Sequence, residues 1–122
     1  MFVKTAIIIL FHGSRADGAA EAVRRIINEV RNRGCYDVVE AAFLQHTSPA
    51  FATAVQSCVQ LGTSKIVVVP FFLQMGLHVT ADVPVLIDRA REHYPDVQIS
   101  MTHAVGAHPG MIDIVLDLAG NA

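Results

Sequence analysis

The pattern of apolar and polar positions along the chain predicts four β-strands. Residues 5–10 and 66–72 are apolar at nearly every position, which is typical of strands buried on both faces of a parallel sheet. Residues 38–44 form another apolar stretch. Residues 97–101 alternate between polar and apolar side chains, as expected for a half-covered edge strand.

The predicted strands at residues 5–10 and 38–44 are each followed by a segment with the period of a helix. Residues 18–33 gather apolar side chains on one face, and Gly34 closes the helix in the position just past its end. The second helix is expected to have Ser48 as its N-cap and Pro49 in its first turn, and to end at Gly62.

Two more helices follow the later strands. A third helix is expected from about Asp82, a candidate cap, to Tyr94, and Pro109 opens a last helix with mostly apolar side chains. The strands start about 30 residues apart, the spacing of right-handed βαβ units. We predict an α/β fold, a small four-stranded parallel sheet of flavodoxin-like type in three α/β/α layers, formed by residues 1–122 as a single domain.

The amino-acid composition of the chain indicates which classes of binding partner to expect. Apolar residues make up 52% of the 122 residues and charged residues only 16%, which favours burial of some apolar surface between subunits. The net charge of -2 argues against nucleic-acid binding, and residues 5–11 are too few to span a membrane. Cys35 and Cys58 lack metal-ligand spacing and are expected to be reduced packing residues. We therefore expect a cytoplasmic protein.

Two histidines follow apolar strands. His12 comes directly after the first strand, and His78 follows the third strand after Gly76. Parallel neighbours end at the same carboxyl edge, where open α/β sheets bind ligands, so we expect both rings to converge there. Each histidine also has a structural interpretation, as a strand terminator or a plain loop residue. A neutral imidazole at this edge can bind a divalent metal ion or accept a proton near pH 7.

The turn after His12 has features of an anion site. Gly13 and Ser14 are turn formers, and their backbone N–H groups near a helix start can hold an anion. Arg15 is either a solvated surface residue or a clamp for a carboxylate. Asp82 is favoured as a helix cap over a catalytic acid.

The remaining histidines have open roles. His46, His103 and His108 lie at the expected carboxyl edge or its rim, and His93 suits the end of a helix dipole. An apolar stretch surrounds the end of the third strand and can serve as core, as a wall for a large flat ligand or as a subunit contact. Its members are Phe71, Phe72, Leu73, Met75 and Leu77.

Common nucleotide and zinc motifs are absent from the sequence. There is no GxGxxG, no P-loop and no HExxH, so dinucleotide, nucleoside triphosphate and zinc-protease functions have no support.

Four segments together resemble the class II tetrapyrrole chelatases, and most of all the small-type sirohydrochlorin cobaltochelatases of cobalamin biosynthesis. They are residues 11–15 (FHGSR), 43–49 (FLQHTSP), 67–73 (VVVPFFL) and 76–84 (GLHVTADVP). The likeness extends from about Lys4 to Leu118, and it implies a chelatase-like fold.

The resemblance implies a lyase that inserts a divalent metal ion into sirohydrochlorin, Co²⁺ first and Ni²⁺ or Fe²⁺ as alternatives. It assigns metal binding and catalysis to the matching His12 and His78. It also implies a homodimer, because longer relatives contain two such domains, and no permanently bound cofactor. The residues expected to contact the tetrapyrrole are Gly13, Ser14, Arg15, Gln45, Met75 and Leu77.

One departure from the family pattern keeps an alternative open. Relatives commonly carry a glutamate where this chain has Gln45, so a non-catalytic module that binds metal or tetrapyrrole on the same fold is the second hypothesis. A phosphatase that uses His12 ranks lower, because Phe11 stands where an arginine should precede the His-Gly pair.

Overall fold

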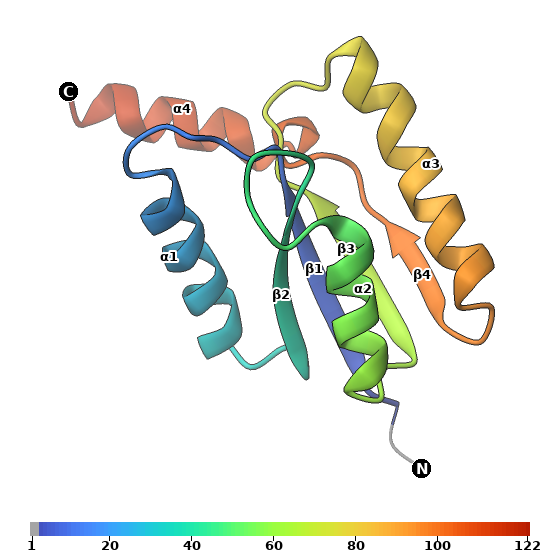
Figure 1. Cartoon of the computed structure of the whole chain (residues 1–122). Coiled ribbons are helices and arrows are strands. Elements are labelled where there is room, and N and C mark those ends of the chain that lie inside the picture. The colour runs from blue at the N-terminus through green and yellow to red at the C-terminus, as the bar shows by residue number, and fades with distance from the viewer. Residues whose placement is uncertain (1–2) are drawn as a thin grey trace.

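The computed structural model describes residues 3–122, apart from the side chain of His78. Strands and helices alternate along the chain (Figure 1). They are β1 (Thr5–Phe11), α1 (Ala19–Asn32), β2 (Val38–Phe43), α2 (Phe51–Gln60), β3 (Lys65–Pro70), α3 (Leu77–His93), β4 (Gln98–Met101), the short 3₁₀ helix η1 (Val105–Ala107) and α4 (Gly110–Gly120).

The four strands form one parallel sheet in the order β2-β1-β3-β4. In the centre of the sheet Ile9 of β1 pairs with Ala41 of β2 and Val69 of β3. The predicted flavodoxin-like α/β fold is confirmed, and β1 and β3 are neighbours as expected. Their carboxyl ends therefore lie side by side, and the loops that follow them can share a site.

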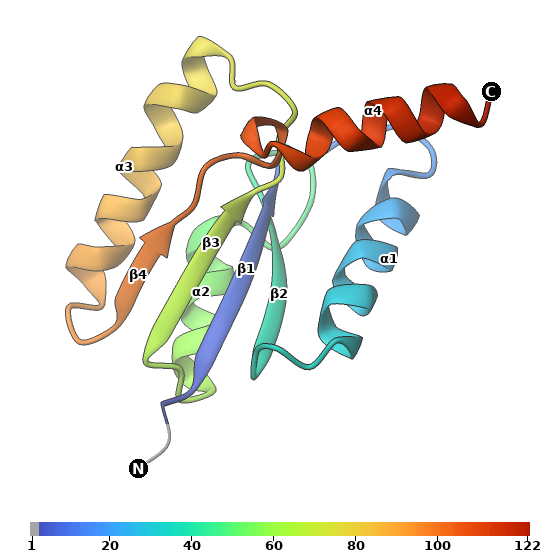
Figure 2. The ribbon, with the colours of Figure 1, turned by 180° about the vertical axis from the view of Figure 1, so that it is seen from behind.

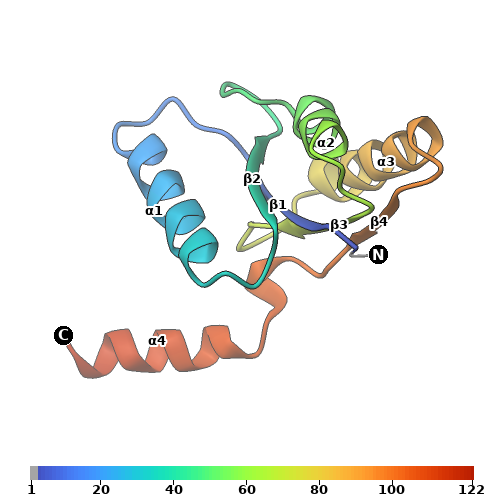
Figure 3. The ribbon, with the colours of Figure 1, turned by 90° about the horizontal axis from the view of Figure 1, so that it is seen from below.

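The main core lies between the sheet and the helices α2 and α3, which cover one face (Figure 3). Its central side chains have almost no exposure to solvent. They are Ile8 and Leu10 of β1, Ile66 and Val68 of β3, Val55 of α2 and Val83 of α3.

Helix α1 lies on the opposite face and covers only β1 and β2. Ile27 of α1 packs there against Ile9 of β1 and Val39 of β2. On β3 only alternate residues are buried, and Val67 and Val69 are half-buried. The prediction that residues 66–72 are buried on both faces is therefore wrong for β3, because no helix of residues 3–122 lies over this part of the sheet (Figure 2).

Helix α2 begins later than the sequence predicts. Ala50 is its N-cap, and neither Ser48 nor Pro49 caps it. The Pro49 carbonyl accepts a hydrogen bond from the Phe43 N–H at 2.9 Å, and the Ser48–Pro49 peptide bond is cis. Pro49 thus extends the pairing with β2, so the helix begins only after it.

Helix α3 begins five residues earlier than expected, at Leu77 instead of Asp82. Gly76 is its N-cap, and Pro84 lies inside the helix. The prediction of Asp82 as a cap is wrong. It relied on the preference of proline for the first helical turn, whereas here the helix continues through Pro84 without that N–H.

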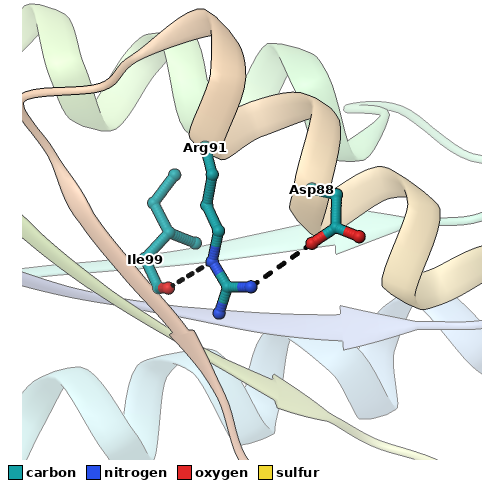
Figure 4. Close-up of polar contacts among 3 residues, drawn as sticks. All are labelled: Asp88, Arg91 and Ile99. Atoms are coloured by element: carbon teal, nitrogen blue, oxygen red, sulfur yellow. Dashed lines mark hydrogen bonds and ion pairs between the residues drawn. The ribbon is translucent and has the colours of Figure 1, made fainter.

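The other boundaries agree with the sequence to within a few residues. Gly34, with φ of 69°, follows α1, and α3 ends at His93 before Tyr94. Arg91 at the end of α3 donates to the Ile99 carbonyl at 2.9 Å and contacts Asp88 at 3.3 Å (Figure 4). The hydrogen bond to Ile99 fixes the end of α3 to the edge strand β4.

Candidate functional site at the carboxyl edge of the sheet

His12 is the first residue after β1, and its exposed side chain is held by two neighbours. The Gln45 side-chain amide Nε2 lies 3.1 Å from Nδ1 of the ring. The buried Phe72 ring meets the imidazole edge-on, with ring centroids 6.3 Å apart and an interplanar angle of 82°. These residues come from the loops after β1, β2 and β3, so the fold itself builds the surroundings of His12.

The loops after β1 and β2 continue the pairing of the strands. Leu44 donates its N–H to the Phe11 carbonyl at 3.1 Å, and Gln45 donates to the His12 carbonyl at 3.1 Å. Gly13 has φ of 93°, and a Cβ there would lie 1.7 Å from the Gln45 carbonyl oxygen. Only glycine fits this close approach, so Gly13 fixes the distance between the His12 and Gln45 backbones.

The Gln45 amide selects which ring nitrogen of His12 can bind a ligand. Its Nε2 is a donor, so in the orientation seen here Nδ1 accepts and a neutral ring carries its proton on Nε2. Rotation of the amide presents Oε1 instead, which holds a proton on Nδ1 and leaves the Nε2 lone pair free. The orientation with Oε1 facing the ring is the one that allows His12 Nε2 to act as a metal ligand.

His12 lies between two hollows. The larger, of about 630 Å³, is mainly apolar and is bounded by α1 and β2. Its floor includes Phe11 and Phe43, with Arg24 also in its lining. The smaller, of about 420 Å³, lies between the Gln45 loop and α3.

Asp82 and Arg89 of α3 line the smaller hollow together with His12 and Gln45. Sequence reasoning assigned Asp82 to a cap because it began α3 too late. It also missed Arg89, which lies within both the predicted and the observed helix. Residues seven apart lie on one face of a helix, so the correct start at Leu77 gives the signal that places Asp82 and Arg89 together.

The predicted substrate residues do not all gather around His12. Ser14 Oγ accepts the Ala16 N–H at 3.0 Å, and Arg15 is exposed. Leu77 is 89% exposed in the first turn of α3. Met75 is half-buried in a separate hollow of about 360 Å³ that His103 also lines.

The remaining histidines have different surroundings. His108 Nδ1 accepts the Gly110 N–H at 2.9 Å, so this ring caps the start of α4. His93 meets Tyr94 edge-on in the last turn of α3, with ring centroids 4.6 Å apart. His46 is exposed and has φ of 63°.

His78 lies in the first turn of α3, but its side chain is outside the described part of the structure. The convergence of His12 and His78 therefore stays a prediction. Among the side chains that are described, no group of three histidine, cysteine or acidic residues is placed to hold a metal ion.

Neither cysteine belongs to this site. Cys58 of α2 is fully buried in the core, and Cys35 is exposed. Burial, with a further contribution from the Glu40 carboxylate, raises the pKa of the Cys58 thiol to about 11. The Cys58 thiol therefore stays protonated near neutral pH, as expected of a packing residue.

The strand order and the histidine at the carboxyl edge define a flavodoxin-like α/β protein with a candidate ligand site at that edge. The chain belongs to the CbiX family, whose family model matches residues 6–122.

Relatives with established names agree with this membership. The sirohydrochlorin cobaltochelatase of Methanocaldococcus jannaschii is 28% identical over 138 aligned positions, covering 93% of this chain and 96% of the relative. The chloroplastic sirohydrochlorin ferrochelatase of Arabidopsis thaliana is 32% identical, covering 91% of this chain and 49% of the relative.

A solved structure supports the same family membership. The cobalt complex of the sirohydrochlorin chelatase SirB from Bacillus subtilis subspecies spizizenii superposes with a TM-score of 0.87 at 28% identity. The match covers 98% of this chain and 51% of SirB. The chain thus spans nearly the whole archaeal relative but about half of the plant and Bacillus proteins. Within residues 3–122, none of the helices has both the length and the apolar content to cross a membrane.

Proposed function

We propose that this protein inserts a divalent metal ion, Co²⁺ in the first place, into sirohydrochlorin without ATP. The observation that carries the proposal is the placement of His12 at the carboxyl edge of β1, held by Gln45 and open to two hollows. Membership of the CbiX family supports it, as do the names of the cobaltochelatase and ferrochelatase relatives.

Metal insertion needs a site that holds the ion loosely, helps to remove its water and accepts two pyrrole protons. Neutral imidazoles bind cobalt, nickel and iron without the tight ligation of thiolates, and they accept protons near pH 7. We assign metal binding and proton transfer to His12 and His78. The position of His78 in the first turn of α3, after the strand next to β1, supports this pairing.

Sirohydrochlorin is a flat macrocycle fringed by carboxylates. The apolar hollow beside α1 suits its flat face, and Arg24 there, or Arg89 in the smaller hollow, suits its carboxylates. Gly13 and Gln45 belong to the same site through the backbone contact that joins them. Ser14, Arg15, Met75 and Leu77 stay proposed substrate contacts.

The protein is further proposed to act as a cytoplasmic homodimer in a cobalamin or sirohaem pathway. The sequence resemblance supports the dimer, as does the coverage of about half of SirB. The metals in the names of the relatives, cobalt and iron, leave Fe²⁺ as an alternative to Co²⁺. Ni²⁺ stays an alternative from the sequence resemblance.

The function is tested by anaerobic absorbance time courses of sirohydrochlorin with Co²⁺, Ni²⁺ or Fe²⁺, with and without the protein. We expect protein-dependent acceleration, fastest with Co²⁺. His12→Ala and His78→Ala should each lower the rate by about 100-fold or more, whereas His93→Ala should match the wild type. A spectral shift of bound tetrapyrrole without acceleration would instead favour the binding module suggested by Gln45.

A further inference from the structure

Asp82 is an exposed carboxylate that the packing of the fold does not explain. Helix α3 begins at Leu77, so Asp82 lies in its second turn, too far along to cap the helix. Among the side chains that the structure describes, the only ion pair joins Asp88 to Arg91, and none of them forms a hydrogen bond with Asp82. The carboxylate of Asp82 is therefore available for a ligand.

The smaller hollow beside His12 is where this carboxylate lies. Asp82 is the one acidic residue in the described lining of that hollow, across from His12 and Gln45. Arg89 is seven residues further along α3, and a rise of about 1.5 Å per residue separates the two positions by about 10 Å. Solvent screens charges at that separation, so Arg89 leaves Asp82 able to bind a cation.

The larger hollow has its acidic residue far from the ring of His12. Glu40 is the one acid in its described lining, and it pairs with Ile8 in the middle of the sheet. His12 lies four residues after Ile8, about 13 Å further along the strand direction. Of the two carboxylates, Asp82 is thus the one that shares the carboxyl edge with His12.

The position of His78 belongs to the same stripe of α3 as Asp82. Residues 78, 82, 85 and 89 follow at intervals of four, three and four, the spacing of one helix face. Three members of this stripe, Asp82, Val85 and Arg89, line the smaller hollow. Asp82 therefore shares a hollow with His12 and a helix face with the position of His78.

We propose that Asp82 binds the divalent metal ion together with His12 and His78. The proposal rests on the proposed chelatase function and adds a ligand to its metal site. Two neutral imidazoles and the Gln45 amide carry no charge, so Asp82 supplies the negative charge that attracts the ion. One carboxylate and two imidazoles leave coordination positions open for water, so the ion is held and can still pass to the macrocycle.

The proposal is tested with Co²⁺ alone, by titration calorimetry of the protein without sirohydrochlorin. Asp82→Asn removes the charge at nearly constant shape and should weaken Co²⁺ binding by about tenfold or more, since even the outer partners of metal ligands contribute that much. Asp88→Asn, at an exposed carboxylate of the same helix, is the control and should match the wild type. Equal Co²⁺ affinities of Asp82→Asn and the wild type would overturn the proposal, as would a wild type that does not bind Co²⁺.

A carboxylate returned to the same hollow should restore the affinity. Gln45 lines this hollow and lies against the His12 ring, so Gln45→Glu/Asp82→Asn should bind Co²⁺ within several-fold of the wild type. Gln98→Glu/Asp82→Asn adds the same charge at the start of β4, on the opposite edge of the sheet, and should stay weak. Equal affinities of the two double variants would overturn the role of Asp82 as a ligand.

These titrations are independent of metal insertion. A wild type that binds Co²⁺ through Asp82 but does not accelerate insertion would exclude the chelatase function and keep the metal site. Accelerated insertion with unchanged Co²⁺ affinity in Asp82→Asn would keep the function and exclude this ligand.

Discussion

The side-chain amide of Gln45 lies 3.1 Å from Nδ1 of His12, while the Gln45 N–H bonds the His12 carbonyl at the same distance. One residue of the β2 loop thus holds both the backbone and the ring of the histidine that follows β1. The fold therefore provides a hydrogen-bond partner for the His12 ring as well as for its backbone.

Loss of this contact should weaken metal insertion. We expect Gln45→Leu to lower kcat/KM by about 10- to 100-fold, the usual effect of removing a partner that orients a metal-binding histidine. Gln45→Glu keeps a hydrogen-bond acceptor and should stay within several-fold of the wild type. The Gln45 side chain is exposed, so both variants should fold normally. Equal rates for Gln45→Leu and the wild type would exclude a positioning role.

Gly13 should be intolerant of any side chain. Gly13→Ala combines a left-handed backbone with a clash against the Gln45 carbonyl oxygen, so we expect a loss of about 2–4 kcal/mol in the free energy of unfolding. Gly18 has a similar φ of 81° but no atom within 4 Å of a Cβ, so Gly18→Ala isolates the backbone cost, about 1–2 kcal/mol. Urea unfolding curves would measure both. Similar losses would show that the contact with Gln45 is unimportant.

Arg89 should act on substrate affinity more than on turnover. An exposed guanidinium in the hollow beside His12 can pair with a substrate carboxylate. Arg89→Ala should therefore raise KM for sirohydrochlorin about tenfold, equivalent to about 1.4 kcal/mol, with little change in kcat. Arg33→Ala removes an exposed charge at the end of α1 and serves as the control. A KM unchanged by Arg89→Ala would leave the larger hollow as the carboxylate site.

The buried thiol of Cys58 should make stability depend on pH in the alkaline range. Its pKa is about 11 in the folded protein against 9.0 for an unperturbed thiol, so its contribution is fully present below pH 9. That contribution, about 2–3 kcal/mol, is lost as pH rises from 9 to 11, because only the unfolded thiol ionises readily.

Urea unfolding of the wild type and Cys58→Ala across this range measures the effect. The difference in their unfolding free energies should shrink between pH 9 and pH 11. Cys35→Ala, at an exposed cysteine, should show no such trend. A constant difference between wild type and Cys58→Ala would contradict the shifted pKa.

The sequence predicts the sheet well because each strand is marked by a short, mostly apolar stretch that can be recognised without knowing its neighbours in the fold. The parallel pairing of β1 with β3 follows from the segments around Ile8 and Val68, which are buried in the core as expected. The end of α1 follows from Gly34, whose backbone is left-handed.

The errors arise where tertiary contacts override local preference. Pro84 predicts a helix start, but the helix passes through it, so Asp82 lies inside the helix instead of capping it. Pro49 predicts another helix start, but its carbonyl pairs with β2. Val67 is half-buried because no helix of residues 3–122 lies over that face of β3 (Figure 2), which its apolar neighbours in the sequence do not reveal. The prediction of His12 as a site residue needed only the strand before it, whereas its contact with Gln45 required the fold.

The two hollows beside His12 lie on opposite faces of the sheet, one against α1 and the other against α3. If the macrocycle binds in only one of them, a hydrated ion can reach the same imidazole through the other. Neither reactant has to enter before the other, so initial-rate measurements should show random order of addition, and a strictly ordered pattern would argue against two routes. In that arrangement His12 would be the meeting point of two reactants that arrive from opposite faces of the sheet.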